Sequence, residues 1–174
     1  MSDAEYTSEG VLGTAGFSNV ASYNLECMYR GVPAHAGAVP WEGVNALDAL
    51  VSTYVNVSML RQQIQPTERI HGYIMEALKA TSNSIPGLTK VQYTTRSTTS
   101  KDAKSLAGRI RQCMEAGALA SGCRLEIEEK AGYADLRVNE PLSNSFQQNM
   151  AANGIQVLQF KGPVAAATDQ GNVG

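Results

Sequence analysis

A hydrophobic period of two residues marks four segments of the chain. In residues 22–30 (SYNLECMYR), alternate positions carry Tyr23, Leu25, Cys27 and Tyr29. Such alternation is typical of a half-buried strand, whose successive side chains point to opposite faces of a sheet. The same period recurs along the chain, so that the four predicted strands are 22–30, 68–76, 89–96 and 124–130.

A hydrophobic period of three to four residues marks two longer segments. Between residues 44 and 64, apolar side chains recur in steps of three and four, which predicts an amphipathic helix of about five turns. Pro66 would end this helix. A second helix is predicted over 100–121, with Thr99 in the position of an N-cap and Gly122 as a natural stop.

The predicted elements follow the order strand, helix, strand, strand, helix, strand. This is the order of a split βαβ, ferredoxin-like domain, in which two helices cover one face of a four-stranded antiparallel sheet. We therefore expect an α+β fold, with this βαββαβ domain over residues 19–134. Residues 135–174 add a helix at 141–154 and a strand at 155–160, which do not fit into it. Because the apolar face of that helix has nothing of its own to pack on, we expect a second domain to start here.

Composition and charge exclude several classes of protein. Apolar residues make up 43 % of the 174 positions, which is enough to build a packed core. The net charge of −2 and the lack of a Lys/Arg block give no footprint for nucleic acid. No apolar run reaches about 18 residues, so no membrane span is predicted. Cysteines without a close pair, and an acidic start unlike a signal peptide, indicate a reducing, cytoplasmic setting.

Candidate chemistry centres on His35, one of two histidines in the sequence. It lies in the stretch GVPAHAGAVPWEGVNALDAL, residues 31–50, among prolines and small residues. Judged by spacing alone, such a loop histidine more often caps a turn than performs chemistry. On the same basis Asn83 is a turn former and Arg96 a solvated charge at a strand end. His71 lies on the polar face of its strand, and we assign it no chemistry.

The stretch around His35 closely resembles the signature that opens the lid, or dimerisation, domain of the di-zinc aminoacylase and dipeptidase family, peptidase family M-twenty. The likeness continues through the helix LVSTYVNVSMLRQQI, the NSIP loop, the strand that ends with Arg96, and the segment ATDQGNV. Within the family the chain is most similar to the dipeptidase-like branch named peptidase M-twenty domain-containing protein two.

The resemblance implies an architecture. In the family, the lid is a ferredoxin-like domain inserted into a zinc-binding catalytic domain. Residues 1–18 would then be a leader that is a remnant of the catalytic domain, 19–134 the lid, and 135–174 the truncated start of a second, α/β catalytic-domain segment. Family lids pair through an edge strand and the first helix. A homodimer is therefore expected, in which each lid sends a histidine into the partner's active site.

The resemblance also implies roles for three residues. His35 matches the lid histidine that donates a hydrogen bond to the oxyanion formed when water attacks the scissile amide, a catalytic role that suits a fixed imidazole. Asn83 matches an asparagine that binds substrate beside it. Arg96 resembles an arginine that grips the substrate carboxylate, for which a guanidinium fork is well shaped.

The resemblance implies zinc in the full-length family, but we expect none to be bound by this chain alone. The family's metal site begins with a His-x-Asp motif and a Glu-Glu pair upstream of the lid, and residues 1–22 contain no histidine. A hydrolytic zinc needs about three protein ligands and a water. We assign no metal ligand, and interpret Asp169 as a structural residue in a loop that borders the family's active site.

Three functional hypotheses follow. The first is the lid and dimerisation fragment of a metal-dependent peptidase or amidohydrolase, which hydrolyses a dipeptide or an N-acyl amino acid and is inactive alone. The second is a stand-alone ferredoxin-like module for dimerisation or small-molecule binding, without catalysis. The third is a decayed pseudoenzyme, suggested by the segment EALKATSN, which lacks the glycine pair that usually precedes the family's Asn-Ile-Pro loop.

Overall fold

The computed structural model describes residues 11–77, 81–159 and 162–173. The chain divides into two compact units. Unit 2 is continuous in sequence and takes up Ser22–Gly132, against the range 19–134 expected for the lid. Unit 1 combines the two ends of the chain, 1–21 and 133–174. Since the units are separate bodies, each is described by itself.

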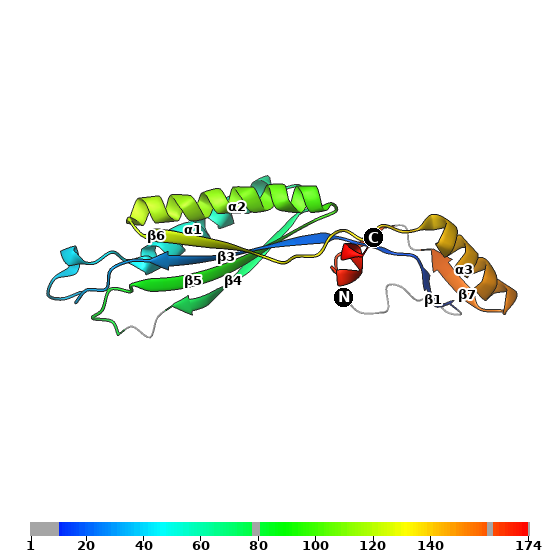
Figure 1. Cartoon of the computed structure of the whole chain (residues 1–174), viewed down its shortest axis with the longest axis horizontal. Helices are drawn as coiled ribbons and strands as arrows, with labels where there is room; N and C mark the ends of the chain where they lie inside the picture. Colours follow the sequence, from blue (N-terminus) through cyan, green and yellow to red (C-terminus); the bar gives the residue numbers. More distant parts are fainter. Residues whose placement is uncertain (1–10, 78–80, 160–161, 174) are drawn as a thin grey trace. The chain divides into compact units, whose positions relative to one another are not determined.

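Unit 2 is built on one four-stranded antiparallel sheet. Its strands are β3 (Ala21–Arg30), β4 (Arg69–Ala77), β5 (Leu88–Ser97) and β6 (Arg124–Lys130). They lie in the order β4-β5-β3-β6, with β4 and β6 at the edges. The helices α1 (Ala46–Leu60) and α2 (Ser100–Ser121) cover one face of the sheet, as Figure 1 shows. The predicted order of elements, the antiparallel sheet and the two helices are confirmed.

The core of unit 2 lies between the sheet and the two helices. On β3, Leu25, Cys27 and Tyr29 are buried, as their alternation predicts. On β5 the buried positions also alternate, and include Val91 and Tyr93. The residues between them lie on the face that carries no helix, because successive side chains of a strand point to opposite sides.

The inner face of α1 differs from the predicted apolar stripe. Val51 and Tyr54 are 50 % and 48 % exposed, whereas the smaller Ala49 and Thr53 are fully buried. The reason is a close approach of α2, since a Cβ added at Gly117 would lie 2.3 Å from Thr53 Oγ1 and 2.6 Å from the Ala49 carbonyl oxygen. Only small side chains fit at this crossing, so Val51 and Tyr54 are turned outward, while Leu50 and Val57 remain buried in the core as the stripe predicts.

The ends of α2 form as the sequence predicts. The hydroxyl of Thr99 accepts a hydrogen bond from the backbone N–H of Asp102 at 3.1 Å, which satisfies one of the open donors of the first turn. At the other end Gly122 adopts the left-handed conformation, with φ of 75°. A residue with a side chain rarely adopts this conformation, so glycine suits the helix stop.

Unit 1 joins strands from opposite ends of the sequence. β1 (Val11–Ala15) pairs in parallel with β7 (Gln156–Gln159), and β2 (Ser18–Asn19) with β8 (Pro163–Val164). The helix α3 (Glu140–Ala152) packs against β1 and β7. The helix predicted at 141–154 is found as α3, which ends at Ala152, and the strand predicted at 155–160 is found as β7, which begins at Gln156; Phe160 lies outside the described residues.

The apolar residues of α3 remain largely uncovered. Leu142 is 68 % exposed and Phe146 48 %, in agreement with the expectation that this face lacks a packing partner. No helix within the described ranges is long and apolar enough to cross a lipid bilayer.

Candidate functional site

The loop that carries His35 has a closed base. Val32 and Val44 each donate a backbone N–H to the other's carbonyl oxygen, both at 2.9 Å. Beside them, a Cβ added at Gly31 would lie 1.9 Å from the Val44 carbonyl oxygen, so only glycine fits there. The Gly31 N–H also donates to the Gly87 carbonyl oxygen at 2.8 Å. The backbone therefore fixes the loop to the end of the sheet where β5 begins.

The structure brings His35 and Asn83 together. His35 forms an antiparallel bridge with Ser84, and the Ala36 N–H donates to the Asn83 carbonyl oxygen at 2.8 Å. Two loops that are far apart in the sequence are thus joined by backbone hydrogen bonds. Both side chains are exposed at this end of the sheet.

The imidazole of His35 is oriented by its own loop. The Gly37 backbone N–H donates to His35 Nδ1 at 3.2 Å. A neutral imidazole has one donor and one acceptor nitrogen, so with Nδ1 accepting, the proton lies on Nε2. His35 therefore offers an exposed Nε2–H donor, the form that a developing oxyanion requires.

Asn83 is held by its neighbour Thr81. The Thr81 hydroxyl donates to Asn83 Oδ1, which fixes the side-chain amide through its oxygen. The amide nitrogen carries two N–H donors in addition. The segment EALKATSN, in which the sequence lacks the usual glycines, lies partly outside the described residues.

Arg96 lies at the other end of the sheet. It follows Leu88, the first residue of β5, by eight positions in a continuous strand, which is a span of about 27 Å. The His35 loop adjoins the Leu88 end. Within one chain, therefore, the structure unites His35 with Asn83 and does not bring Arg96 to them.

Arg96 instead contacts the second histidine. Its Nε donates to His71 Nε2 at 3.1 Å, and its Nη1 is buried with no hydrogen-bond partner among the described residues. Burial, followed by the charges of Arg96 and Arg61, lowers the pKa of His71 from its usual value. Sequence reasoning missed this pair. The available signal was the pairing of 68–76 with 89–96, which places both side chains on one face.

The described residues do not fit a metal centre. Nowhere in the described ranges do three or more His, Cys, Asp or Glu side chains gather as a metal would require. Asp169 begins the short 3-10 helix Asp169–Asn172, and its carboxylate accepts a hydrogen bond from the Thr168 hydroxyl at 3.3 Å. We therefore derive no chemical step of this chain through a bound metal.

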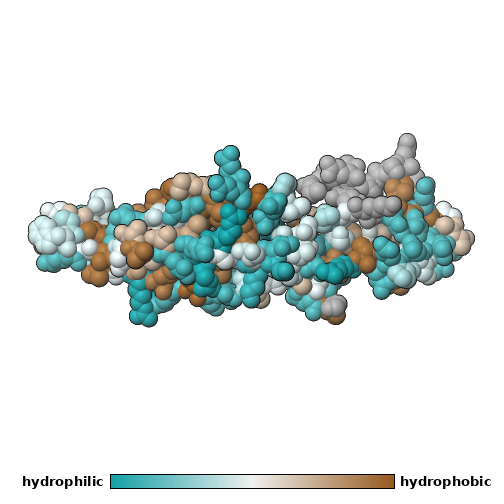
Figure 2. Space-filling view, turned by 90° about the horizontal axis from the view of Figure 1, so that it is seen from above, coloured by the Kyte–Doolittle hydropathy of each residue, from teal (hydrophilic) through white to brown (hydrophobic). Residues whose placement is uncertain are grey.

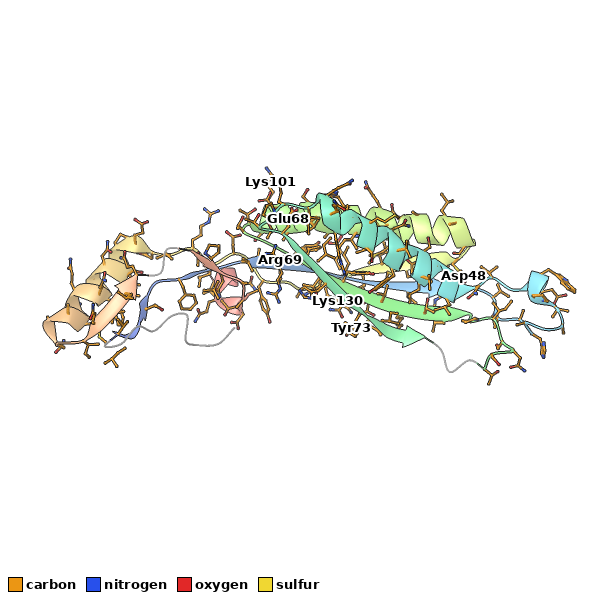
Figure 3. The ribbon with its side chains drawn as sticks, turned by 180° about the vertical axis from the view of Figure 1, so that it is seen from behind. Asp48, Glu68, Arg69, Tyr73, Lys101 and Lys130 are labelled. Atoms are coloured by element: carbon orange, nitrogen blue, oxygen red, sulfur yellow. The ribbon has the colours of Figure 1, made fainter. Side chains whose placement is uncertain are left out.

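An exposed apolar surface borders the edge strand β4. Tyr73 and Ile74 are 58 % and 47 % exposed, and the outward side chains of α1 are comparably exposed. Figure 3 labels Tyr73 on β4, and Figure 2 shows apolar patches among polar residues on the helix-covered side of unit 2. We refer to the following exposed residues of α1 and β4 as the edge surface, of which Tyr73 lies on the face of the sheet that carries no helix: Val51, Tyr54, Val55, Met59, Tyr73 and Ile74. Exposed edge strands and apolar patches are typical sites of association.

A family model described as the peptidase dimerisation domain matches residues 16–121. Xaa-Arg dipeptidase of Mus musculus is 38 % identical over 160 residues, and its human counterpart 36 %. A p-aminobenzoyl-glutamate hydrolase polypeptide from Escherichia coli is 23 % identical over 146 residues. The alignments cover 89, 89 and 84 % of this chain but 37, 36 and 30 % of those relatives, so the chain spans about a third of their length.

Solved structures show the same fold at low sequence identity. AtUAH in complex with (S)-hydroxyglycine superposes with a TM-score of 0.76 at 16 % identity, over 92 % of this chain and 38 % of that one. Aminobenzoyl-glutamate utilization protein from Klebsiella pneumoniae gives 0.72 at 19 % identity, over 93 % of this chain and 44 % of that one.

Proposed function

Because the chain belongs to the peptidase dimerisation domain family of the M-twenty peptidases and amidohydrolases, we propose that it is the lid and dimerisation part of a metal-dependent enzyme that hydrolyses dipeptide or N-acyl amide bonds. Residues 1–18 and 135–174 belong, in this proposal, to the catalytic domain into which the lid is inserted. The metal, zinc in our proposal, would activate water there, and its ligands would come from outside this chain.

The proposed dimer forms through the edge surface. β4 presents one unpaired side at the edge of the sheet, beside the exposed apolar residues of α1. Two copies related by a two-fold axis present the same patch to each other, and their β4 strands then run antiparallel. This arrangement buries apolar area and satisfies the open backbone groups of both edges.

Antiparallel pairing also explains the separation of the site residues. The Arg96 end of β4 and β5 in one subunit comes to lie near the Leu88 end in the other. The partner subunit's Arg96 then approaches His35 and Asn83, and two composite sites result. In each, His35 Nε2–H donates to the oxyanion, the Asn83 amide binds the substrate, and the arginine holds the substrate carboxylate.

The observation that carries this proposal is the fixed tautomer of His35, whose Nδ1 accepts from the Gly37 N–H and leaves Nε2–H as a donor. The proposed dimer is tested by sedimentation equilibrium of the full chain across a range of concentrations. We expect twice the mass of 18.5 kDa at the higher concentrations. A monomer at every concentration contradicts the dimer.

One observation favours the second candidate, a module that binds a small molecule. A groove of about 520 Å³ lies beside the first turn of α1 and the last turn of α2. Its polar lining includes Asn45, Asp48, Ser52 and Ser121. Figure 3 labels Asp48 on α1. An NMR titration with a dipeptide separates the two candidates. If the protein is a dimer in which the signals of Arg96 and His35 do not shift, while the signals of the groove residues do, the second candidate is favoured.

We also propose a ferredoxin-like classification for unit 2 and a cytoplasmic location. The classification is supported by the strand order β4-β5-β3-β6 with both helices on one face. The location is supported by the three free cysteines, two of them buried.

A further inference from the structure

Arg96 is a guanidinium with unused hydrogen-bonding capacity. Arginine has five N–H donors, and the hydrogen bond to His71 uses the one on Nε. Nη1 is buried and has no partner among the described residues. Burying a charged donor without an acceptor is costly, and such groups in native structures require an explanation. Arg96 is therefore a charged group whose hydrogen bonding is incomplete within the described residues.

The register of the sheet places His71 beside this guanidinium. Arg69 lies opposite Arg96, and His71 lies opposite Thr94 two pairs further along. His71 and Arg96 are therefore diagonal neighbours on the face that carries no helix. Arg69 is turned elsewhere, because its Nη1 donates to the Pro66 and Glu68 carbonyl oxygens at 2.5 and 2.6 Å. His71 is thus the side chain of β4 that holds Arg96.

The hydrogen bond also defines the chemical state of His71. Nε2 accepts a hydrogen bond from a group that is always charged, so Nε2 itself carries no proton and the neutral ring has its proton on Nδ1. The charged groups that act on the ring, Arg96 from β5 and Arg61 after α1, are both cations. They and burial keep the pKa of His71 low, so the imidazole is neutral near neutral pH.

We propose that His71 is a positioning residue, which fixes the guanidinium of Arg96 through Nε and so sets the orientation in which the guanidinium meets a substrate carboxylate. This rests on the carboxylate-binding role of Arg96 in the proposed function. The guanidinium is planar, so a fixed Nε–H direction sets the orientation of the remaining donors. A group that is already oriented loses less conformational freedom when the ligand binds.

The first experiment measures the tautomers directly. Because the chain has two histidines, long-range ¹H–¹⁵N NMR correlations of their ring nitrogens are easily assigned. We expect protonated Nδ1 in His71 and protonated Nε2 in His35, which are opposite tautomers. Arg96→Leu should remove the preference of His71 for the tautomer with its proton on Nδ1, and should leave the tautomer of His35 unchanged. A His71 ring that is charged, or that carries its proton on Nε2, overturns the proposal.

The second experiment measures the consequence for binding. The probes are the dipeptide alanyl-arginine and its C-terminal amide. Their binding to the full chain is measured from the shift of the Arg96 Nε–H signal in NMR titrations. His71→Leu should weaken the dipeptide about tenfold, the effect of one hydrogen bond to a charged group. His71→Gln should restore most of the affinity, because its amide oxygen can accept from Nε. The amide should bind weakly to every variant.

A matched control exists at the opposite edge of the sheet. Arg30 Nε donates to Glu126 Oε1 at 3.0 Å, so Glu126→Leu removes a similar arginine acceptor outside the proposed site. We expect no change in dipeptide affinity for this variant. Equal affinity of wild type and His71→Leu overturns the positioning role. If wild type does not prefer the dipeptide over its amide, the proposed function fails, and the tautomer measurement still decides whether His71 orients Arg96.

Discussion

The two ends of the sheet in unit 2 hold their functional candidates in different ways. At the His35 end, backbone hydrogen bonds join two loops, and the imidazole accepts from a backbone N–H. At the Arg96 end, one side chain holds another across the edge strand. Backbone hydrogen bonds fix the position of the His35 loop, whereas the position of the Arg96 guanidinium depends on a hydrogen bond between two side chains. The same sheet therefore offers one loop that is held by its backbone and one guanidinium that is held by an imidazole.

The largest effect is expected at the base of the His35 loop, where the backbone of Gly31 approaches that of Val44 most closely. Gly31→Ala places a methyl group against the Val44 carbonyl oxygen and should lower the free energy of unfolding by about 3 kcal/mol. Urea denaturation measures this loss, and the NMR tautomer of His35 reports the state of the loop. Gly108→Ala is the control, since no atom lies within 4 Å of its added Cβ. It should stabilise α2 by up to about 1 kcal/mol.

A Gly31→Ala variant as stable as wild type, with an unchanged His35 ring, would show that the loop base is not rigid. Such a result would remove the contrast between the two ends of the sheet.

The next effect concerns the edge strand that lies beside the Arg96 end. Tyr73→Lys puts a charge into the edge surface and into the proposed antiparallel contact with a second copy, where it opposes itself across the two-fold axis. We expect dimer affinity to fall at least about tenfold in sedimentation equilibrium. Leu119→Lys is the control, because Leu119 is 87 % exposed on α2 and outside the edge surface. Equal losses for both variants would place the contact elsewhere.

The smallest effect is a pH dependence at the Arg96 end. The fold lowers the pKa of His71 below the usual value of about 6.5, so the unfolded chain binds more protons as the pH falls through this range. The contribution of His71 to stability is therefore present above about pH 6.5 and is lost as the pH falls toward and below its lowered pKa. Urea midpoints measured across this range should show the loss in wild type.

His71→Leu should flatten this part of the pH profile, because the titrating group is gone. A profile that is unchanged by the substitution would mean that His71 titrates normally in the fold, which contradicts a lowered pKa.

Local hydrophobic periods were sufficient to predict the architecture of unit 2. The alternation at Leu25 and Cys27 and the cap at Thr99 predict strands and helix ends from short stretches of sequence. They were not sufficient for β1, because its buried residues Val11 and Ala15 are four positions apart and leave no alternation to read. The inner face of α1 also escaped prediction, because Gly117 of another helix decides which residues fit.

The candidate site was predictable only in part. The motif around His35 identified His35 and Asn83, which the structure joins through backbone bonds. The partner of Arg96 could not be found by motif, because the bond to His71 depends on the register between β4 and β5. Register is set by the whole hairpin, and a shift by one residue would move His71 to the other face.

The central claim is that the His35 end of one subunit meets the Arg96 end of its partner. Paramagnetic relaxation in a sample that mixes two forms of the chain tests it most directly. One form is ¹⁵N-labelled, and the other carries a spin label on the cysteine of Ala38→Cys. In the spin-labelled form, Cys113→Ser removes the least buried of the native thiols. Within one chain the two ends are separated by about 27 Å along β5. We predict strong broadening of the Arg96 Nε–H signal in the labelled copy. An unbroadened Arg96 in a dimeric sample, with broadening at β6 instead, would contradict the account.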